Sequence, residues 1–307
     1  MDNSAAALPG GTAVAAGGGR RRNYARRYGW FIVPAGAVVL AVILFPWAFT
    51  LFMSAHDWKI GGGRVYVGFE NYRKLFTDER FLWSVVRTLY YTVLAVILPM
   101  IFGTVAALVF HRRFPLRGLA RTVFILPMMA TPVAVALVWT MMFHPQLGVL
   151  NWLLTQVGLP PSMWVYDART VIPTLVIVEV WHWTPLVMLI VLGGLASLPV
   201  DPYEAAKIDG ASAWQAFRHI TLPLLMPFIV VALIIRTIDA LKAFDTIYVI
   251  TQGGPGTSSE TINIFLYLQG FAYYNMGYAS AVVVVFFALI VSLAALLLWT
   301  RNRVKDA

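Results

Sequence analysis

The sequence of 307 residues contains no cysteine, and only 12% of its residues are charged. Without cysteine the chain has no disulfide framework, no cysteine-ligated iron–sulfur cluster and no thiol nucleophile. Soluble domains carry about 25% charged residues. Half of that value, together with a hydrophobic fraction of 60%, indicates that lipid rather than water surrounds most of the chain.

Patterns for nucleotide binding, metal binding and catalysis are also missing. No G-x-x-x-x-G-K-[ST] segment is present, so the chain has no P-loop for ATP. Glu179 and His182 form one E-x-x-H pair, whereas carboxylate-bridged metal sites use two such pairs and further carboxylates. No acid–base pair or hydrolytic triad stands out. We therefore expect no metal site and no catalytic residues, which argues against a membrane enzyme.

Six apolar segments are long enough to cross a bilayer, which requires about 20 helical residues. The sequence therefore predicts an all-α membrane protein with six transmembrane helices, at residues 29–54, 88–110, 122–143, 170–196, 224–248 and 277–299. We expect this transmembrane domain to cover residues 29–300. Residues 1–28 are rich in Ala, Gly and Arg and predict a disordered basic tail, and residues 301–307 form a short C-terminal tail.

Lys and Arg are unevenly distributed between the segments that connect the six predicted spans. The two termini and the segments 111–121 and 197–222 contain fourteen of them, and the opposite set contains seven. Cytoplasmic loops carry an excess of Lys and Arg, so both termini and these two segments are predicted to be cytoplasmic. The net charge of +9 is then an orientation signal. No basic stretch stands free of the apolar runs, and we expect no binding of nucleic acid.

A polar segment, DPYEAAKIDGASAWQAFRHITLP at residues 201–223, separates the fourth and fifth spans. Asp201 as N-cap, followed by proline and then Glu204, predicts a capped helix start. Gly210 predicts the end of this helix, since glycine accepts the left-handed conformation. Ser212 repeats the capping pattern with a glutamine three residues later, which predicts a second short helix that the final proline closes. The segment therefore consists of two short helices joined at a glycine.

The second of these helices carries an apolar stripe, Trp214, Phe217 and Ile220, at three-residue steps. Such a stripe at the cytoplasmic side requires an apolar partner. From the periodicity alone two interpretations remain, a helix lying in the membrane interface and a docking surface for another protein.

The same segment matches a longer pattern, E-A-A-x-x-D-G-A-x-x-x-x-x-F-x-x-I-x-L-P. It resembles the EAA signature of permease subunits in binding-protein-dependent ABC importers. The resemblance implies the fold of type I ABC importer permeases, in which this segment is the coupling helix that docks on a cytoplasmic ATPase subunit. The residues that it assigns to ATPase coupling are Glu204, Ala205, Ala206, Asp209, Gly210, Ala211, Trp214, Phe217, Ile220, Leu222 and Pro223.

The individual roles follow from the chemistry of these residues in the implied interface. The alanines and the glycine allow close packing, and Phe217 fills an apolar pocket. Glu204 and Asp209 offer carboxylates to basic groups of the ATPase or to nearby backbone amides. The alternative for the two carboxylates is simple helix capping, and both roles are compatible.

Within this family the chain is similar to the sugar group, the maltose and glycerol-phosphate permease type. The resemblance rests on EVWHWTPLVMLIVLGGLASLP, FDTIYVITQGGPGTSSET and VGFENYRKLF. It implies a second homologous permease, two ATPase subunits that bind ATP and Mg²⁺, an extracytoplasmic solute-binding protein and a sugar or polyol solute, in a bacterial inner membrane. The chain itself then binds no cofactor. The alternatives are an ABC importer for another solute class and an ion-coupled secondary transporter.

Charged residues within the predicted spans are candidates for the solute path, because charge in mid-bilayer is costly. Glu179 and His182 lie in the fourth span, and the fifth contains four charges of alternating sign at three-residue steps. Alternating charges at this spacing can pair along one helix face, so a neutralised ladder facing another subunit is the alternative. The candidates for the solute path are Glu179, Trp181, His182, Trp183, Arg236, Asp239, Lys242 and Asp245.

A turn rich in glycine follows the fifth span and lacks Lys and Arg. It consists of Gln252, Gly253, Gly254 and Pro255. One interpretation is a flexible external connector. The resemblance implies a contact for the solute-binding protein instead.

Overall fold

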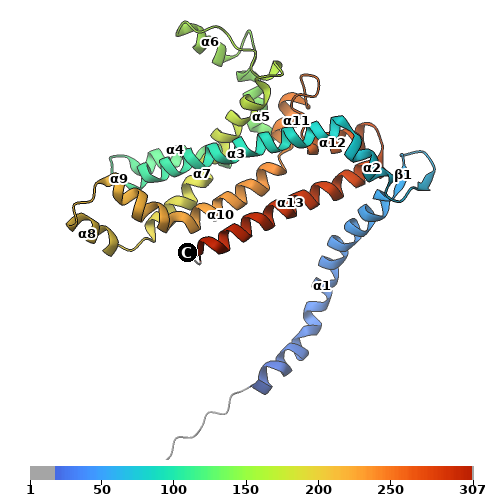
Figure 1. Ribbon diagram of the computed structural model, residues 1–307, viewed down its shortest axis with the longest axis horizontal. Helices are drawn as coiled ribbons and strands as arrows, with labels where there is room; N and C mark the ends of the chain where they lie inside the picture. Colours follow the sequence, from blue (N-terminus) through green and yellow to red (C-terminus); the bar gives the residue numbers. More distant parts are fainter. Residues whose placement is uncertain (1–17, 306–307) are drawn as a thin grey trace, which may run out of the picture. The chain divides into compact units, whose positions relative to one another are not determined.

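The computed structural model describes residues 18–305 (Figure 1). Residues 1–17 of the predicted basic tail and residues 306–307 of the C-terminal tail lie outside the described residues. The helix α1 (Gly18–Ser54) begins within the predicted tail and contains the first predicted span. Chain contacts divide the molecule into two compact units at residues 50 and 51. The second unit contains the remaining spans and every site considered below.

Within residues 18–305, five helical segments are long and apolar enough to cross a membrane. Besides α1 they are α3 (Glu79–His111), α7 (Val171–Ala196), the continuous segment Ala213–Leu241 that ends with α10 (Leu222–Leu241), and α13 (Met276–Lys305). They confirm the first, second, fourth, fifth and sixth predicted spans, with shifted ends. In Figure 1, α3, α10 and α13 run side by side.

The third predicted span is broken into two helices. Its residues form α4 (Arg117–Met129) and α5 (Pro132–Met142), which are bent by 97° relative to each other. Pro132 has no backbone N–H and holds the preceding Thr131 in an extended conformation, with φ −69° and ψ 142°. The sequence predicts a single span over residues 122–143, and the structure divides it into two helices with the break at Ala130 and Thr131. This pair of helices is a sixth candidate span.

The most extensive helix pairing joins α3 and α7, and their contact forms the centre of the apolar core. Gly103 of α3 allows the two backbones to approach closely. A Cβ atom at Gly103 would lie 2.6 Å from the Cβ of Val187 and 3.0 Å from the amide nitrogen of Met188. The absence of a side chain at Gly103 is therefore a packing requirement.

We expect Gly103→Leu to destabilise the subunit, because overpacking a tight core costs about 1–3 kcal/mol. The matched control is Gly193→Leu in α7, where a Cβ atom would meet no heavy atom within 4 Å. Thermal unfolding of the purified subunit in detergent measures the difference. A similar midpoint for both variants would contradict the close packing of α3 on α7.

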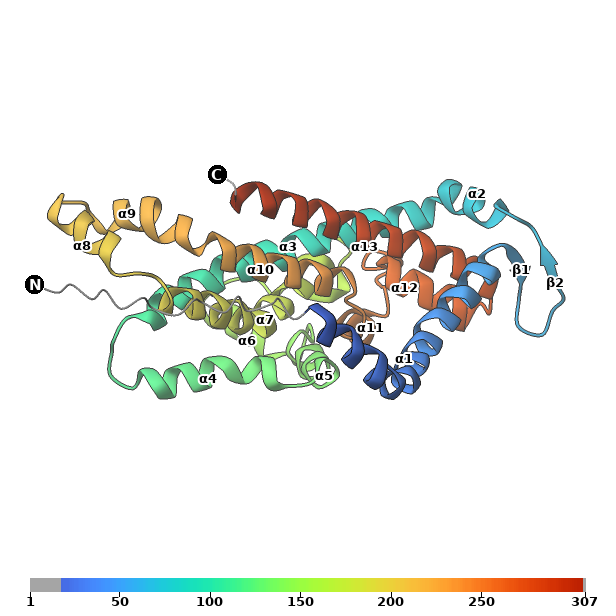
Figure 2. The same cartoon turned by 90° about the horizontal axis from the view of Figure 1, so that it is seen from below.

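Two groups of short elements lie at opposite ends of the helical bundle (Figure 2). At one end are the antiparallel strands β1 (His56–Trp58) and β2 (Arg64–Tyr66), paired with Asp57 opposite Val65, and the helix α2 (Glu70–Thr77). At the other end are α8 (Asp201–Ile208) and α9 (Ala213–Ala216). The segment 55–87 thus contains secondary structure of its own.

The remaining connections are also partly helical. Residues 144–169 contain α6 (Val149–Gln156) and a 3₁₀ turn η1 (Trp164–Tyr166), and residues 245–272 contain α11 (Asp245–Thr251), α12 (Ile262–Tyr267) and a π-helical turn η3 (Leu268–Ala272). Apart from residues 245–248, which belong to the predicted fifth span, the sequence predicts no helix in these connections. They are too short to produce a clear hydropathy signal.

Candidate functional site

The segment 201–223 folds as two short helices with a turn at Gly210, as predicted. Gly210 has φ +75°, in the left-handed region, and its amide donates to the carbonyl of Lys207 at 3.2 Å. The second helix begins with the predicted capping box. The backbone amide of Ser212 donates to Gln215 Oε1 at 2.7 Å, and the amide of Gln215 donates to Ser212 Oγ at 3.3 Å.

Two boundaries of this segment differ from the prediction. The N-cap of α8 is Val200, whose carbonyl accepts hydrogen bonds from the amides of Tyr203 and Glu204, so Asp201 is already helical and caps nothing. At the other end α9 does not stop at Pro223. It continues through a π-helical turn, η2 (Phe217–Thr221), directly into α10. A π-helical turn shifts the hydrogen-bond pattern next to the proline, which lets the helix pass through.

The predicted coupling residues differ in exposure. Glu204, Ala205, Asp209, Gly210, Trp214 and Pro223 are exposed, and Ala206, Ala211, Phe217, Ile220 and Leu222 are half-buried. The exposed apolar Ile208, with 87% of its surface accessible, stands beside the carboxylates of α8. The exposed side of this loop thus presents acids, small residues and two large apolar side chains, Ile208 and Trp214.

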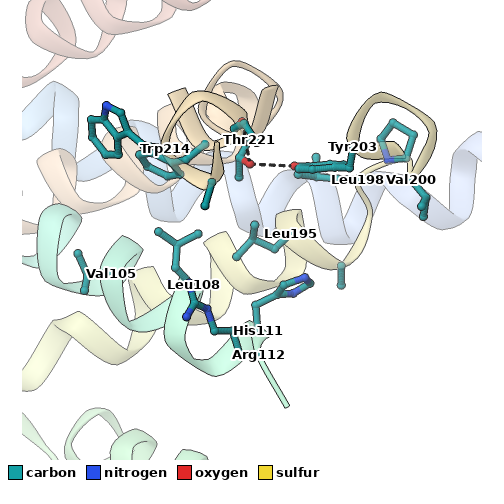
Figure 3. A pocket seen from close by; sticks show the side chains of 15 residues that line it. Val105, Leu108, His111, Arg112, Leu195, Leu198, Val200, Tyr203, Trp214 and Thr221 are labelled. Atoms are coloured by element: carbon teal, nitrogen blue, oxygen red, sulfur yellow. Dashed lines mark hydrogen bonds between the residues drawn. The ribbon is translucent and has the colours of Figure 1, made fainter. Parts of the chain in front are cut away.

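The rings of Trp214 and Phe217 also face a groove within the subunit. Their ring centroids lie 5.5 Å apart, and both rings line a groove between α9 and the ends of α3 and α7 (Figure 3). Tyr203 donates a hydrogen bond of 3.0 Å to Thr221 across one side of this groove, which joins α8 to η2. The predicted apolar stripe is therefore partly covered within the subunit.

A second cluster combines three charges from α7 and α10. Arg236 is fully buried, and its guanidinium donates to Glu179 at 2.9 Å and to Asp239 at 2.6 Å. The same group donates to the carbonyl of Ala95 in α3 at 3.3 Å and lies 4.8 Å from the ring centre of Trp183. The guanidinium therefore ties three helices together and neutralises the carboxylate of Glu179, which is 5% exposed.

These side chains border a pocket of about 220 Å³. Glu179, Trp183 and Asp239 line it from the helices, and Lys242 and Asp245 line it from the segment that follows α10. The lining contains three acids and one base, Lys242. Even when Arg236, which pairs with Glu179 and Asp239, is included, the site keeps one excess negative charge. The ring of Trp183 and the neighbouring carboxylates can bind the hydroxyl groups of a neutral polyol. The same carboxylates would repel an anion.

The predicted charge ladder along one helix was partly wrong. Only Arg236 and Asp239 pair along α10, which ends at Leu241, and Asp245 begins the separate helix α11. The side-chain amide of Asn263 donates to the carbonyls of Leu241 and Ala243 at 3.2 and 3.3 Å. Because this cap comes from a residue distant in sequence, the local pattern did not indicate where the helix ends.

Two of the predicted path residues lie apart from the pocket. Trp181 is 45% exposed on another face of α7, with its ring edge against Trp139 at 5.7 Å. His182 is buried, and its Nε2 lies 3.2 Å from the carbonyl oxygen of Ala130, at the break between α4 and α5. The structure thus brings together six of the eight predicted residues.

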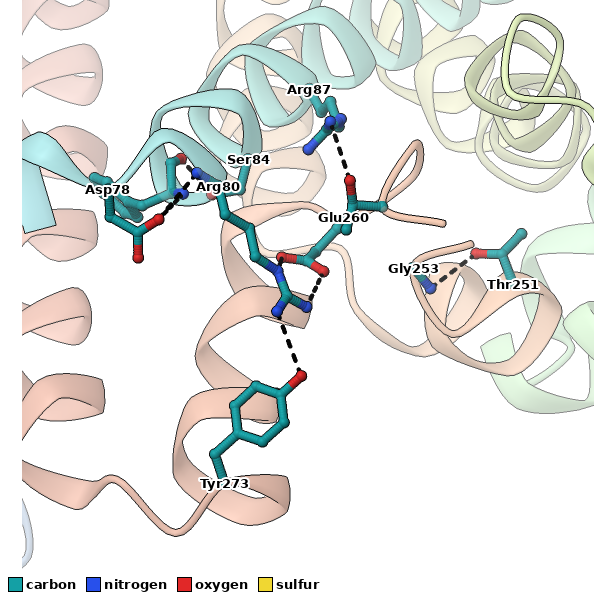
Figure 4. A network of polar contacts seen from close by, with 10 residues as sticks. Asp78, Arg80, Ser84, Arg87, Thr251, Gly253, Glu260 and Tyr273 are labelled. Carbon is teal, nitrogen blue, oxygen red and sulfur yellow. Dashed lines mark hydrogen bonds and ion pairs between the residues drawn. The ribbon is translucent and has the colours of Figure 1, made fainter. Parts of the chain in front are cut away.

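The turn at residues 252–255 is held by an internal network and by α3 (Figure 4). Thr251 and Ser259 share a hydrogen bond of 2.7 Å between their hydroxyls. The buried Glu260 accepts two hydrogen bonds from the guanidinium of Arg80, at 2.8 and 2.7 Å. Of the turn itself, Gln252 is exposed and Gly253 is buried. The turn therefore has defined anchors on both sides.

We expect Arg80→Gln to loosen this turn, because hydrogen bonds to charged groups contribute about 1.5–3 kcal/mol. Hydrogen exchange of residues 252–260 in the purified subunit measures the effect. The control is Arg73→Gln, which breaks an exposed pair with Glu70 that solvent screens and that therefore contributes little. Unchanged exchange in Arg80→Gln would show that the ion pair with Glu260 does not hold the turn.

Neither of the two long-range ion pairs, Arg236 with Glu179 and Arg80 with Glu260, was predicted from the sequence. For the first pair a signal existed, since both residues are charged and lie well inside apolar spans. Pairing of opposite charges between spans is an alternative to pairing within one span. For the second pair no local pattern connects residues 180 positions apart.

Comparison with known proteins assigns the chain to a family. The family described as "Binding-protein-dependent transport system inner membrane component" matches residues 99–306. The chain belongs to this family. The resemblance to permease subunits of binding-protein-dependent ABC importers, inferred from the EAA pattern, is thereby confirmed. With five apolar spans and one bent pair of helices in the described part of the chain, this inner membrane component is a multi-pass membrane protein.

Relatives and solved structures agree with this assignment. The chain is 38% identical to the trehalose/maltose transport system permease protein MalF of Thermococcus litoralis, over 85% of this chain and 88% of that protein. It is 34% identical to the sulfoquinovosyl glycerol transport system permease protein SmoG of Agrobacterium fabrum, over 90% of each.

The fold of this inner membrane component is similar to that in the crystal structure of a bacterial ABC transporter involved in the import of the acidic polysaccharide alginate. The TM-score is 0.81 at 22% identity, over 92% of this chain and 99% of that chain. This likeness confirms the predicted fold of ABC importer permeases.

Proposed function

We propose that the chain is one permease subunit of an ATP-driven importer for a sugar or related polyol. The observation that carries the solute class is the 38% identity to a trehalose/maltose permease over most of both chains. The subunit would provide half of the translocation path. A second homologous permease, two ATPase subunits with their ATP and Mg²⁺, and an extracytoplasmic binding protein would complete the importer.

The proposed contact with the ATPase is the exposed side of residues 201–223. The charge distribution of the connecting segments supports a cytoplasmic position for this loop and for both termini. Glu204 and Asp209 are exposed and are available to basic groups of the ATPase. The continuous helix from Ala213 to Leu241 offers a rigid route by which movement of the loop reaches the pocket beside Asp239.

The proposed solute contact is the pocket at Glu179, Trp183 and Asp239. Carboxylates accept hydrogen bonds from hydroxyl groups, and the ring of Trp183 offers an apolar face. The excess negative charge of the lining favours a neutral solute over a sulfonated or carboxylated one. Gln252, Gly253, Gly254 and Pro255 remain the proposed contact for the binding protein, supported by the ordered network that presents Gln252 at the surface.

Uptake by the reconstituted importer tests this proposal. Proteoliposomes that contain both permeases and the ATPases, with the binding protein outside and ATP inside, are expected to accumulate labelled neutral disaccharides or polyols. Uptake of a sulfonated or uronic acid sugar in preference to these would contradict the solute class. Uptake by this chain alone, driven by an ion gradient without ATP, would contradict the importer and support a secondary transporter.

A further inference from the structure

A groove lies behind the loop 201–223, and no side chain of the described residues fills it. Its volume is about 910 Å³, near the upper end of the 300–1,000 Å³ typical of small-molecule sites. Its walls come from the last turns of α3 and α7, from α8 and from α9 with η2 (Figure 3). Most of the lining side chains are apolar, among them Leu108, Leu195, Leu198 and Phe217.

One side of the groove is basic. His111 and Arg112 line it at the end of α3, and Figure 3 shows them on the same side, next to Leu108 and Leu195. Both are exposed. The side chain of Arg112 has no hydrogen bond or ion pair with any residue that the structure describes.

The chain after Arg112 adds to this positive charge. The segment 111–121 contains four arginines and no acidic residue. Arg117 folds back and donates to the carbonyls of His111 and Arg112, at 3.5 and 3.4 Å. Arg112 and His111 are the basic residues of the lining, which contains no acidic residue.

The apolar part of the groove extends into the membrane-spanning length of α3. Val105, which lines the groove, is 54% exposed and lies within a span of mean hydropathy 2.6. Arg112 directly follows the last residue of this span, where lipid headgroups are found. An anionic phospholipid requires an apolar surface for its acyl chain and a basic group at headgroup level. Val105 contributes to the first, and Arg112 provides the second.

We propose that this groove binds one anionic phospholipid of the surrounding bilayer. An acyl chain would lie against Val105 and Leu108, and the phosphate would interact with Arg112. This position is between the coupling loop and the ends of two spans, so the lipid would fill a space that the loop otherwise leaves open. The inference rests on the groove itself and is independent of the solute class.

Native mass spectrometry of the full-length subunit tests the site. The subunit is released from nanodiscs of equimolar phosphatidylglycerol and phosphatidylcholine. We expect wild type to retain one phosphatidylglycerol in preference to phosphatidylcholine. Arg112→Gln should lower its retention about fivefold, since one basic residue near an anionic membrane surface contributes about 1 kcal/mol. Leu108→Trp, which fills the groove, should lower the retention of both lipids.

The matched control is Arg113→Gln, which removes the same charge from the neighbouring residue that does not line the groove. It should retain phosphatidylglycerol as wild type does. Equal losses in Arg112→Gln and Arg113→Gln would indicate general surface attraction and overturn the site. Equal retention of the two lipids by wild type, or no retained lipid, would also overturn it. Because Arg112 is exposed, its variant keeps the fold, which circular dichroism checks.

Discussion

Gly210→Pro is expected to abolish ATP-driven uptake while the subunit still inserts and assembles. Gly210 has φ +75°, whereas proline fixes φ near −65° and removes the amide that donates to Lys207. The strain of such a misfit is about 1–3 kcal/mol, enough to displace α8 relative to α9. Uptake in proteoliposomes and stimulation of ATP hydrolysis by the loaded binding protein should each fall by about tenfold or more.

Gly158→Pro is the matched control for this prediction. Gly158 follows α6 with φ +77°, and its amide donates to Thr155 at 3.1 Å, so the chemical change and the local strain are the same. We expect Gly158→Pro to keep stimulated ATP hydrolysis near that of wild type. If Gly210→Pro also keeps uptake and stimulated hydrolysis, residues 201–223 do not couple the permease to the ATPase.

Glu204→Lys is a second test of the same loop, and unlike Gly210→Pro it is compatible with the existing backbone conformation. Glu204 is exposed and makes no side-chain hydrogen bond or ion pair with the described residues. Reversal of its charge should therefore leave the thermal stability of the isolated subunit unchanged. Coupling to the ATPase should be lost, measured as uptake per ATP hydrolysed. A loss of stability equal to the loss of uptake would point to a structural role instead.

The second large effect is expected for Arg236→Met. This change leaves the carboxylate of Glu179 buried and without its positive partner, and breaking a buried pair in this way costs about 3–5 kcal/mol. The thermal unfolding midpoint of the purified subunit should fall, and uptake should fall with it. Lys242→Met, at the exposed rim of the same pocket, is the control and should change stability little.

The double variant Glu179→Gln with Arg236→Met separates pairing from packing. Since it removes the uncompensated charge, it should recover part of the lost stability, and the coupling energy of the two positions follows from the double-mutant cycle. Full stability of Arg236→Met alone would contradict the role of Arg236 as the centre of the network. Uptake that stays low in a stable double variant would indicate that the pair also serves the solute path.

The sequence predicted those parts of the fold that follow from local pattern. Hydropathy located the span at Val171–Ala196 almost to the residue, because an apolar run in a membrane has few alternatives to a helix. The Ser212 capping box and the turn at Gly210 also follow from short-range chemistry. The EAA pattern identified the family, which covers residues 99–306.

The errors arose where distant residues decide the local structure. The cap on Leu241 comes from Asn263, and the break in the third predicted span faces His182, so neither boundary is encoded nearby. The ion pair between Glu179 and Arg236 depends on how α7 packs on α10. Hydropathy does not contain that information. For the same reason the sequence did not indicate the groove at Arg112.

A cross-link from Ile208 tests most directly whether residues 201–223 contact a separate ATPase. The chain has no cysteine, so Ile208→Cys introduces a single reactive thiol at a side chain that is 87% exposed. In the assembled complex a thiol-to-amine cross-linker should join this position to an ATPase chain, and Val65→Cys in β2, at the opposite end, should not. Absence of an ATPase cross-link at Ile208, or an equal one at Val65, would contradict the proposed coupling.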